Sequence, residues 1–346
     1  MTTLTDLFGI SLPIVQAPMA GVQGASLALA VTQAGGLGSL PAATLTPEAL
    51  RRDLVGIRER TTGPINVNFF CHVPPEPDTQ REAAWRALLA PYYAQFGLDP
   101  DAVVAGPARS PFNHDLADVL AEFPQAVVSF HFGLPTSDLL ERVRATGAKV
   151  LSSATTVEEA RWLQAQGVDA IIAQGLEAGG HRGHFLSDDL DSQAGTFALL
   201  PQIVRAVRVP VIAAGGIADA AAVAAARTLG AVGVQVGTAY LLCPEATTSA
   251  VHRQALTADA GESTALTNLF TGRPARGIRN RLMRELGELR GDVPAFPLAA
   301  GAVTPLRGKA EAQGSGDFSP LWAGQNTTGC RAVPAEEITH ALAQGW

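Results

Sequence analysis

The residues best suited to chemistry lie in a glycine-rich segment, 174–183, in which His181 follows Gly179 and Gly180. The apolar run before it, 170–173, is typical of a buried parallel strand. Adjacent glycines let a backbone approach a ligand closely, and an imidazole exchanges protons near neutral pH. The segment therefore indicates a loop at the carboxyl end of a strand that can bind and react. A tight turn with a solvated histidine fits the same residues.

Two later segments repeat the pattern of an apolar run followed by glycine. The runs at 209–214 and 233–236 precede short turns at 215–216 and 237–238. In a (β/α)8 barrel, the loops after the last two strands commonly hold a phosphate with backbone N–H groups. Each turn alone fits an ordinary connection, but three successive units of one design favour a phosphate cradle.

Other reactive side chains give weaker signals. Arg182 could steer an anion, but its place in a glycine loop indicates a solvated side chain. His181 and His184 have no cysteine or third carboxylate at ligand spacing, so we expect no metal site. The three cysteines are far apart and form no CxxC pair, which indicates packing rather than a disulfide framework or a zinc site.

The composition is that of a globular chain with a large core. Of 346 residues, 47% are hydrophobic and only 16% are charged, and 35 glycines suit a fold with many strand-to-helix turns. A net charge of -7 without a basic stripe argues against a nucleic-acid partner. The chain shows neither a signal peptide nor an apolar run long enough to cross a bilayer. We therefore expect a cytoplasmic protein without a membrane partner, and the oligomeric state stays open.

Apolar runs and helical patterns alternate along most of the chain. We expect strands at 12–19, 37–40, 65–70, 126–133, 149–152, 170–173, 209–214 and 233–236. We expect helices at 26–34, 46–60, 80–96, 137–146 and 156–166. Eight such units close a (β/α)8 TIM barrel of the α/β class. A doubly wound open sheet is disfavoured because no G-x-G-x-x-G follows a strand.

Two stretches interrupt the alternation. Residues from 71 to about 124 are too many for a simple strand-to-helix connection and predict an insertion over the barrel rim. The irregular helical pattern at 243–314 predicts a mostly helical lobe at the barrel mouth. We therefore expect a barrel domain at 1–242, this lobe on the substrate side, and a C-terminal segment at 315–346 that returns to the barrel.

Short motifs at the strand ends carry a family resemblance. They are Gln16-Ala17-Pro18-Met19-Ala20-Gly21, Asn66-Val67-Asn68-Phe69-Phe70-Cys71-His72, Ser129-Phe130-His131-Phe132-Gly133, Gly179-Gly180-His181-Arg182-Gly183, Gln235-Val236-Gly237-Thr238-Ala239 and Ser319-Pro320-Leu321-Trp322-Ala323-Gly324-Gln325. Through them the chain resembles class I nitronate monooxygenases, formerly called 2-nitropropane dioxygenases, over nearly its whole length. The second and third motifs are the more specific, because the glycine motifs are shared with FMN-dependent enoyl reductases and NADH:quinone reductases.

The resemblance implies a TIM barrel that holds non-covalent FMN. It also implies oxidation of alkyl nitronates, such as propionate 3-nitronate, by molecular oxygen to aldehyde or ketone products with nitrite or nitrate. The cofactor would carry the redox chemistry while the protein orients the substrate. Carried over by motif, the FMN contacts are Ala17, Met19, Asn68, Gln174, Gly179, Gly180, Gly215, Gly216, Gln235, Gly237 and Thr238. The catalytic candidates are His181 and His131.

Several roles stay open within this set. His181 could take a proton from a neutral nitroalkane or hold an anionic nitronate by hydrogen bond and charge, and the second role is favoured. His131 either shares the pocket or is packed and hydrogen-bonded within the rim. Asn68 could satisfy buried backbone, although an amide at a strand end favours a flavin contact. His72 is interpreted as ordering the insertion and is left out of the site.

The sequence departs from the family pattern at one segment, and two rival functions stay open. Tyrosines are expected to line the substrate pocket of this family, but segment 296–301 contains none, which puts the substrate preference in doubt. The first rival is a flavin reductase of the same fold that passes hydride from NAD(P)H to a quinone or an enoyl thioester. The second is a non-catalytic barrel that binds a phosphorylated metabolite.

Overall fold

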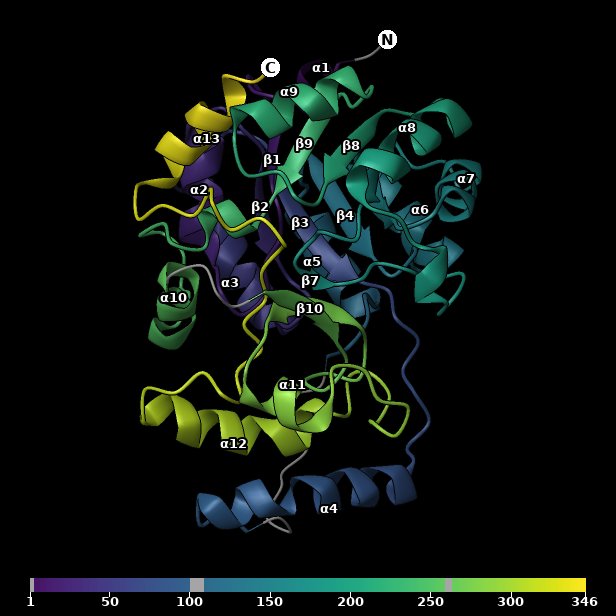
Figure 1. The fold of residues 1–346 in the computed structure, drawn as a ribbon. Helices are drawn as coiled ribbons and strands as arrows, with labels where there is room; N and C mark the ends of the chain where they lie inside the picture. Colours follow the sequence, from purple (N-terminus) through teal and green to yellow (C-terminus); the bar gives the residue numbers. More distant parts are fainter. Residues whose placement is uncertain (1–2, 100–108, 259–262) are drawn as a thin grey trace.

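The structure is a computed structural model that describes residues 3–99, 109–258 and 263–346. Eight parallel strands form its central sheet in the order β1-β9-β8-β6-β5-β4-β3-β2. Their bounds are β1 Ile14–Gln16, β2 Gly38–Pro41, β3 Ile65–Phe70, β4 Val127–His131, β5 Lys149–Ala154, β6 Ala170–Gln174, β8 Val211–Ala214 and β9 Gly233–Val236. A parallel bridge between Val15 and Leu37 joins the two end strands, so the predicted (β/α)8 barrel is confirmed (Figure 1).

Helices surround the barrel and bury their apolar faces against it. They are α2 Ala25–Gln33, α3 Pro47–Arg58, α5 His114–Glu122, α6 Ser137–Ala145, α7 Val157–Ala165, α8 Thr196–Ala206, α9 Ala220–Thr228 and α13 Ala335–Ala343. In α3, Leu50, Leu54 and Ile57 recur at helical spacing and are all buried. Thr46 caps this helix, and Pro47 occupies its first position.

A short helix closes the amino-terminal end of the barrel. Leu4 and Phe8 of α1 Leu4–Phe8 are buried in one cluster with interior residues such as Val15 and Leu37. Figure 1 places α1 at the opposite end of the barrel from α10, α11 and α12. The α1 helix therefore covers the amino-terminal ends of the strands. Within the described ranges, no helix is both long and apolar enough to cross a membrane.

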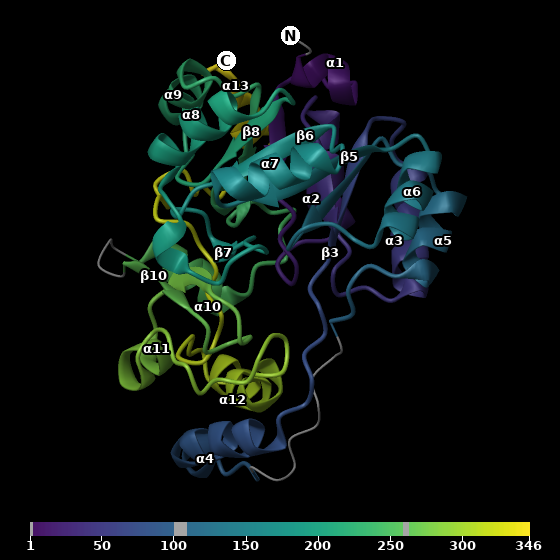
Figure 2. The same cartoon turned by 90° about the vertical axis from the view of Figure 1, so that its right-hand side faces the viewer.

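A lobe lies beyond the carboxyl ends of the barrel strands (Figures 1 and 2), and it has a hydrophobic core of its own. It involves α4 Thr79–Gln95, α11 Arg281–Leu286 and α12 Ala300–Ala312, while α10 Ala250–Thr257 lies on the barrel side of this lobe. Trp85 and Tyr93 of α4 are buried in this core with Leu306 of α12. The long helix of the predicted insertion and the predicted lobe thus share one core. Their residues 100–108 and 259–262 lie outside the described ranges.

A small antiparallel sheet connects the lobe to the barrel. Its strands are β10 Thr264–Thr267, β11 Ala275–Ile278 and β7 Gly180–His181, with β11 in the middle. His181 pairs with Ala275, and Gly180 pairs with Arg276. The sequence indicated only a loop at this point, because two residues show no alternation and their pairing partner lies far along the chain.

Two strands end earlier than predicted. β1 ends at Gln16, before Pro18, whose missing N–H cannot serve a sheet ladder. β4 ends at His131 rather than at Gly133. Phe132 has a φ of 70°, in the left-handed region, and this conformation takes the chain out of the strand. Both ends turn the backbone toward the space between barrel and lobe.

Candidate active site

A cavity of about 290 Å³ lies at the carboxyl ends of the barrel strands, against the lobe. All the candidates from the sequence line it, namely Ala17, Met19, Asn68, His131, Gln174, Gly179, Gly180, His181, Gly215, Gly216, Gln235, Gly237 and Thr238. Strands and the loops that follow them provide these residues, and the C-terminal segment adds Trp322, Gly324 and Asn326. One space therefore contains both histidines and every expected cofactor contact.

The backbone and ring of His181 are both fixed by the lobe. The backbone pairs with Ala275 of β11, and ring Nε2 lies 2.9 Å from Thr271 Oγ1. The Thr271 hydroxyl donates to the Arg273 carbonyl at 3.4 Å, so its oxygen is left to accept from Nε2–H. The proton then resides on Nε2, and Nδ1 keeps its lone pair.

The imidazole of His181 is uncharged at neutral pH. The ring is partly open to the cavity but lies far below the molecular surface, and this burial holds its pKa well below the usual value. Nearby cationic groups, first Arg109 and later Arg273, lower the pKa further. His181 can therefore accept a hydrogen bond or a proton, but it does not supply positive charge.

His131 positions His181 and has both ring nitrogens engaged. Nε2 lies 3.2 Å from the His181 carbonyl, which can only accept, and Nδ1 lies 3.0 Å from Ser153 Oγ. Nε2 therefore carries the proton and Nδ1 accepts from the serine hydroxyl. Burial lowers the pKa of His131 to about 3. Of the two expectations for this residue, the ring lines the cavity and is also hydrogen-bonded within the rim.

Gln174 fastens the loop that carries His181. Its Nε2 donates to the His181 carbonyl at 3.0 Å, and its Oε1 accepts from the Gly183 N–H at 2.8 Å. Both ends of the amide are thus used within the protein. Gln174 lines the cavity, but its geometry suits holding the loop more than binding a ligand.

The expectation of a solvated Arg182 is wrong. The side chain is fully buried and donates to the carbonyls of Gly175 at 2.7 Å and Gln174 at 2.8 Å. Its Nε also donates to Gln193 Oε1 at 2.8 Å. A guanidinium satisfies several acceptors at once because its donors are arranged in a planar fork. The Arg182 side chain is therefore buried because it forms hydrogen bonds with three acceptors, which lie at the end of β6 and in the segments that follow it.

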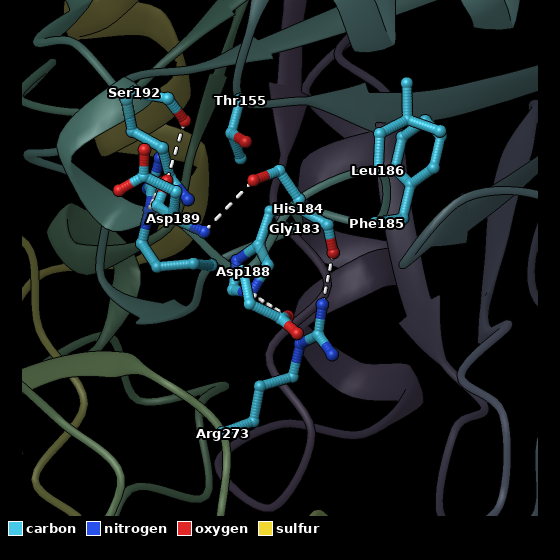
Figure 3. A network of polar contacts seen from close by, with 12 residues as sticks. Thr155, Gly183, His184, Phe185, Leu186, Asp188, Asp189, Ser192 and Arg273 are labelled. Atoms are coloured by element: carbon cyan, nitrogen blue, oxygen red, sulfur yellow. Dashed lines mark hydrogen bonds and ion pairs between the residues drawn. The ribbon is translucent and has the colours of Figure 1, made fainter. Parts of the chain in front are cut away.

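Polar contacts also hold the chain that follows Gly183 (Figure 3). Arg273 donates to the His184 carbonyl, and its Cζ lies 4.3 Å from the ring centroid of Phe132. His184 Nε2 lies 3.4 Å from the Asp188 carboxylate. Because burial lowers the pKa of His184 to about 4, this contact is a hydrogen bond from a neutral ring. The His181 loop is therefore fixed on both sides.

The two glycine turns present unpaired backbone donors to the cavity. Gly215 and Gly216 have φ values of 116° and 73°, conformations that glycine adopts most readily. In the described part of the chain, the N–H groups of Gly215, Gly216, Gly237 and Thr238 make no hydrogen bond. Thr238 Oγ1 accepts from the Gly324 N–H at 2.9 Å, which leaves its hydroxyl proton free to donate. Converging unpaired donors of this kind suit an anion such as a phosphate.

Two side-chain amides complete the polar lining. Gln235 Oε1 is buried and has no partner among the described residues. Asn68 Nδ2 donates to the carbonyl and the hydroxyl of Ser129, at 3.2 and 2.9 Å, and so fixes the amide plane. Its Oδ1 makes no hydrogen bond within the described ranges. Two acceptors are thus available for donors on a ligand.

Aromatic rings, none of them tyrosine, surround His181. The ring centroids of Phe296 and Trp322 lie 5.3 and 5.6 Å from that of His181. The three tyrosines are buried elsewhere, two in the lobe core and Tyr240 against Thr339. The departure noted in the sequence therefore corresponds to a wall without phenolic donors.

The cysteines are free thiols. Cys243 is buried in the main core, and the Cys330 thiol donates to the Thr238 carbonyl at 3.1 Å. Burial raises the pKa of Cys330 to about 12, so this thiol is not a nucleophile at neutral pH. The described segments contain no group of three or more histidine, cysteine or acidic side chains that could hold a metal ion.

Sequence reasoning missed several residues of the cavity wall, among them Ser129, Ser153 and Arg109. Ser129 and Ser153 line the cavity and bind Asn68 and His131. Both stand in or beside strands that were predicted, so the inward alternation of side chains was an available signal. Arg109 also lines the cavity, but it follows an irregular part of the insertion that offered no pattern.

Comparisons with known proteins agree with this geometry. A family model described as nitronate monooxygenase matches residues 1–345. Nitronate monooxygenases from Paraburkholderia phytofirmans and Pseudomonas aeruginosa are each 42% identical to the chain over 343 residues. These matches cover 98% of this chain and 93% and 97% of those proteins, respectively.

Solved structures give the same result. A nitroalkane oxidase from Streptomyces ansochromogenes matches with a TM-score of 0.89 and 39% identity, over 99% of this chain and 97% of that one. FabK from Thermotoga maritima matches with a TM-score of 0.74 and 28% identity, over 99% and 95%. The chain therefore belongs to the nitronate monooxygenase family and is an oxidoreductase.

Proposed function

We propose that this oxidoreductase oxidises alkyl nitronates with molecular oxygen and uses FMN held in the cavity. The observation that carries the proposal is that an uncharged His181 and the unpaired donors of the glycine turns line the same cavity in a chain of this family. The aromatic wall and the lobe limit the access of water to that space. A small organic substrate fits these features.

The residues present fit FMN. The N–H groups of Gly216, Gly237 and Thr238 would hold a single phosphate. Gln235 Oε1 and Asn68 Oδ1 would accept hydrogen bonds from donors on the ring system. A bound FMN would supply the redox chemistry between the organic substrate and oxygen.

The side chains around His181 would bind and orient the nitronate. Nδ1 of the neutral imidazole can take a proton when the substrate is a neutral nitroalkane, whereas a nitronate needs no base and offers Nδ1 no hydrogen-bond donor. His131 and Gln174 hold the His181 carbonyl and thereby fix the position of the ring. The expected products are an aldehyde or ketone together with nitrite or nitrate.

The test is oxygen uptake with a defined nitronate. The purified protein should be yellow, and denaturation should release intact FMN. With propionate 3-nitronate in air it should consume oxygen and release nitrite without NAD(P)H. Denatured protein with added FMN is the control, because free flavin must not give the same rate.

The reductase alternative makes the opposite prediction. FabK, at 28% identity, shares the architecture over nearly the whole chain, so NADH must be tested directly. Rapid anaerobic bleaching of the flavin by NADH, with no oxygen uptake on any nitronate, would refute the monooxygenase proposal.

A further inference from the structure

Arg109 is a partly buried cation without an acidic partner. It lines the cavity, and its Cζ lies 5.7 Å from the ring centroid of Phe296. Its guanidinium forms neither a hydrogen bond nor an ion pair with any residue in the described ranges. Burying a guanidinium without a carboxylate or hydrogen-bond acceptors is costly, because the lost hydration is not replaced.

The other arginines of this region differ from Arg109 in this respect. Arg182, Arg273 and Arg276 all donate to backbone carbonyls. Arg307, which also lines the cavity, has its Nε 2.8 Å from Glu311 Oε1. Arg109 is therefore the cation of this wall whose charge stays available to a ligand.

Arg109 lies near the candidate catalytic histidine. The Phe296 ring is 5.7 Å from the Arg109 Cζ and 5.3 Å from the His181 ring. The charged and titratable groups that act on His181 are Arg109, His131, Arg273 and His72, none of which is acidic. The space around His181 thus has a positive potential although its histidines are neutral.

We propose that Arg109 is the specificity-determining residue of this site and binds an anionic group of the substrate. This inference rests on the proposed function. His181 is neutral and Arg109 supplies the positive charge, so Arg109 favours a nitronate over the neutral nitroalkane from which it forms. The anionic group is either the nitronate itself or a carboxylate elsewhere on the substrate. Both are planar oxyanions that a guanidinium can bind with two parallel hydrogen bonds.

The test compares Arg109→Gln and Arg109→Lys with the wild-type holoenzyme. Three compounds are used: neutral 1-nitropropane, propyl-1-nitronate with one anionic group, and propionate 3-nitronate with two. For Arg109→Gln, kcat/KM for anionic substrates should fall about 10- to 100-fold, mainly through KM, because a hydrogen-bonded charge is lost. The dissociation constant of 1-nitropropane, as substrate or as competitive inhibitor, should change less than about twofold. Arg109→Lys should recover part of the lost kcat/KM, because lysine keeps the positive charge but lacks the planar arrangement of N–H donors of a guanidinium.

Arg51→Gln is the matched control, because Arg51 forms an exposed pair with Glu122 on the outside of the barrel. It should behave as wild type. Losses on both nitronates identify the nitronate group as the anion that Arg109 binds. A loss on propionate 3-nitronate alone identifies the carboxylate, and either result supports the proposal. Equal losses on all three compounds, or unchanged nitronate kinetics in folded Arg109→Gln, would overturn it.

A separate measurement distinguishes failure of this inference from failure of the proposed function. Propionate and nitrate are titrated into the purified protein, and binding is followed by calorimetry without turnover. If wild type oxidises no nitronate but binds these anions more tightly than Arg109→Gln does, the proposed function is refuted, whereas the proposal that Arg109 binds an anion is supported. If the two proteins bind them equally, the role of Arg109 is refuted whatever the activity.

Discussion

At the scale of single residues, the structure changes the role expected of His181. The sequence favoured a histidine that holds the nitronate partly by charge. Burial and the neighbouring cations keep the ring neutral instead, and the Thr271 contact fixes its proton on Nε2. A sequence shows a histidine in a glycine loop, but it cannot show which charges the fold brings beside it. That is why Arg109, which lies in an irregular segment, was missed.

His181→Asn should keep the flavin and lower activity unequally. Turnover of neutral 1-nitropropane should fall about 100-fold or more, because abstraction of its proton needs a base. For propyl-1-nitronate, kcat/KM should fall by less than about tenfold, because a nitronate has no proton to lose and no hydrogen-bond donor for Nδ1. Steady-state oxygen uptake with both compounds measures the difference.

The pH dependence tests the neutral state of His181. Because its folded pKa lies well below 6.5, its protonation cannot affect activity between about pH 6 and 9. An ionisation near the ordinary histidine pKa of 6.5 in the wild-type profile, absent from His181→Asn, would contradict this account. His114→Asn is the control, since His114 lies on the surface with Asp138.

At the scale of elements, sequence periodicity predicted the barrel but not the contacts that hold the His181 loop in place. The run Ile65–Phe70 was predicted with the bounds that β3 has, because turn residues on both sides of a short strand-favouring run define where the strand begins and ends. The β7–β11 pairing joins segments far apart along the chain, and nothing local specifies it. Arg182 stands in the same loop, and its burial depends on acceptors that only the folded chain brings together.

Arg182→Met should therefore loosen the His181 loop. It leaves the carbonyls of Gln174 and Gly175, together with the Gln193 amide oxygen, without their donor. We expect the free energy of unfolding to fall by about 2 to 5 kcal/mol, as is typical when one partner of a buried charged network is removed. Flavin content should fall as well. Chemical denaturation and absorbance measure the two effects.

Arg142→Met provides the comparison for Arg182→Met. Arg142 pairs with Asp118 on the exposed face of α6, where such a pair contributes at most about 1 kcal/mol. Arg182→Lys should recover only part of the stability, because one ammonium cannot serve three fixed acceptors as a guanidinium does. Equal stability of Arg182→Met and Arg142→Met would show that the buried Arg182 contacts contribute little.

At the scale of the whole molecule, the motifs located the cavity better than they described the lobe. Residues at the strand ends meet in a barrel whatever the rest of the chain does, so their convergence could be predicted from strand order alone. The shared core of α4 and α12 could not be predicted in this way, because it depends on how two helices that are far apart along the chain pack against each other. Phe296 and Arg109 come from these lobe-side segments, and they set the character of the substrate wall.

The buried histidines make the whole molecule sensitive to acid. Burial is the main cause that lowers the pKa of His72, His131, His181, His184 and His252. An unfolded chain binds protons on these groups near pH 6.5, whereas the folded chain does not until a much lower pH. The contribution of these histidines to stability should therefore be constant above about pH 7, and stability should fall as the pH drops from about 6.5 toward 4.

His72→Phe tests this account at one position. His72 packs 4.8 Å from Phe296, and neither ring nitrogen has a hydrogen-bond partner of ordinary geometry among the described residues. Burial lowers its pKa to about 4, an effect that the nearby Arg109 carbonyl only partly offsets. Phenylalanine fills the same space without a group that titrates. The stability gain over wild type should therefore grow on acidification, by up to about 3 kcal/mol between about pH 8 and pH 4. Thermal and chemical unfolding at the two pH values measure the gain, and a gain independent of pH would show that His72 does not titrate between the folded and unfolded states as argued.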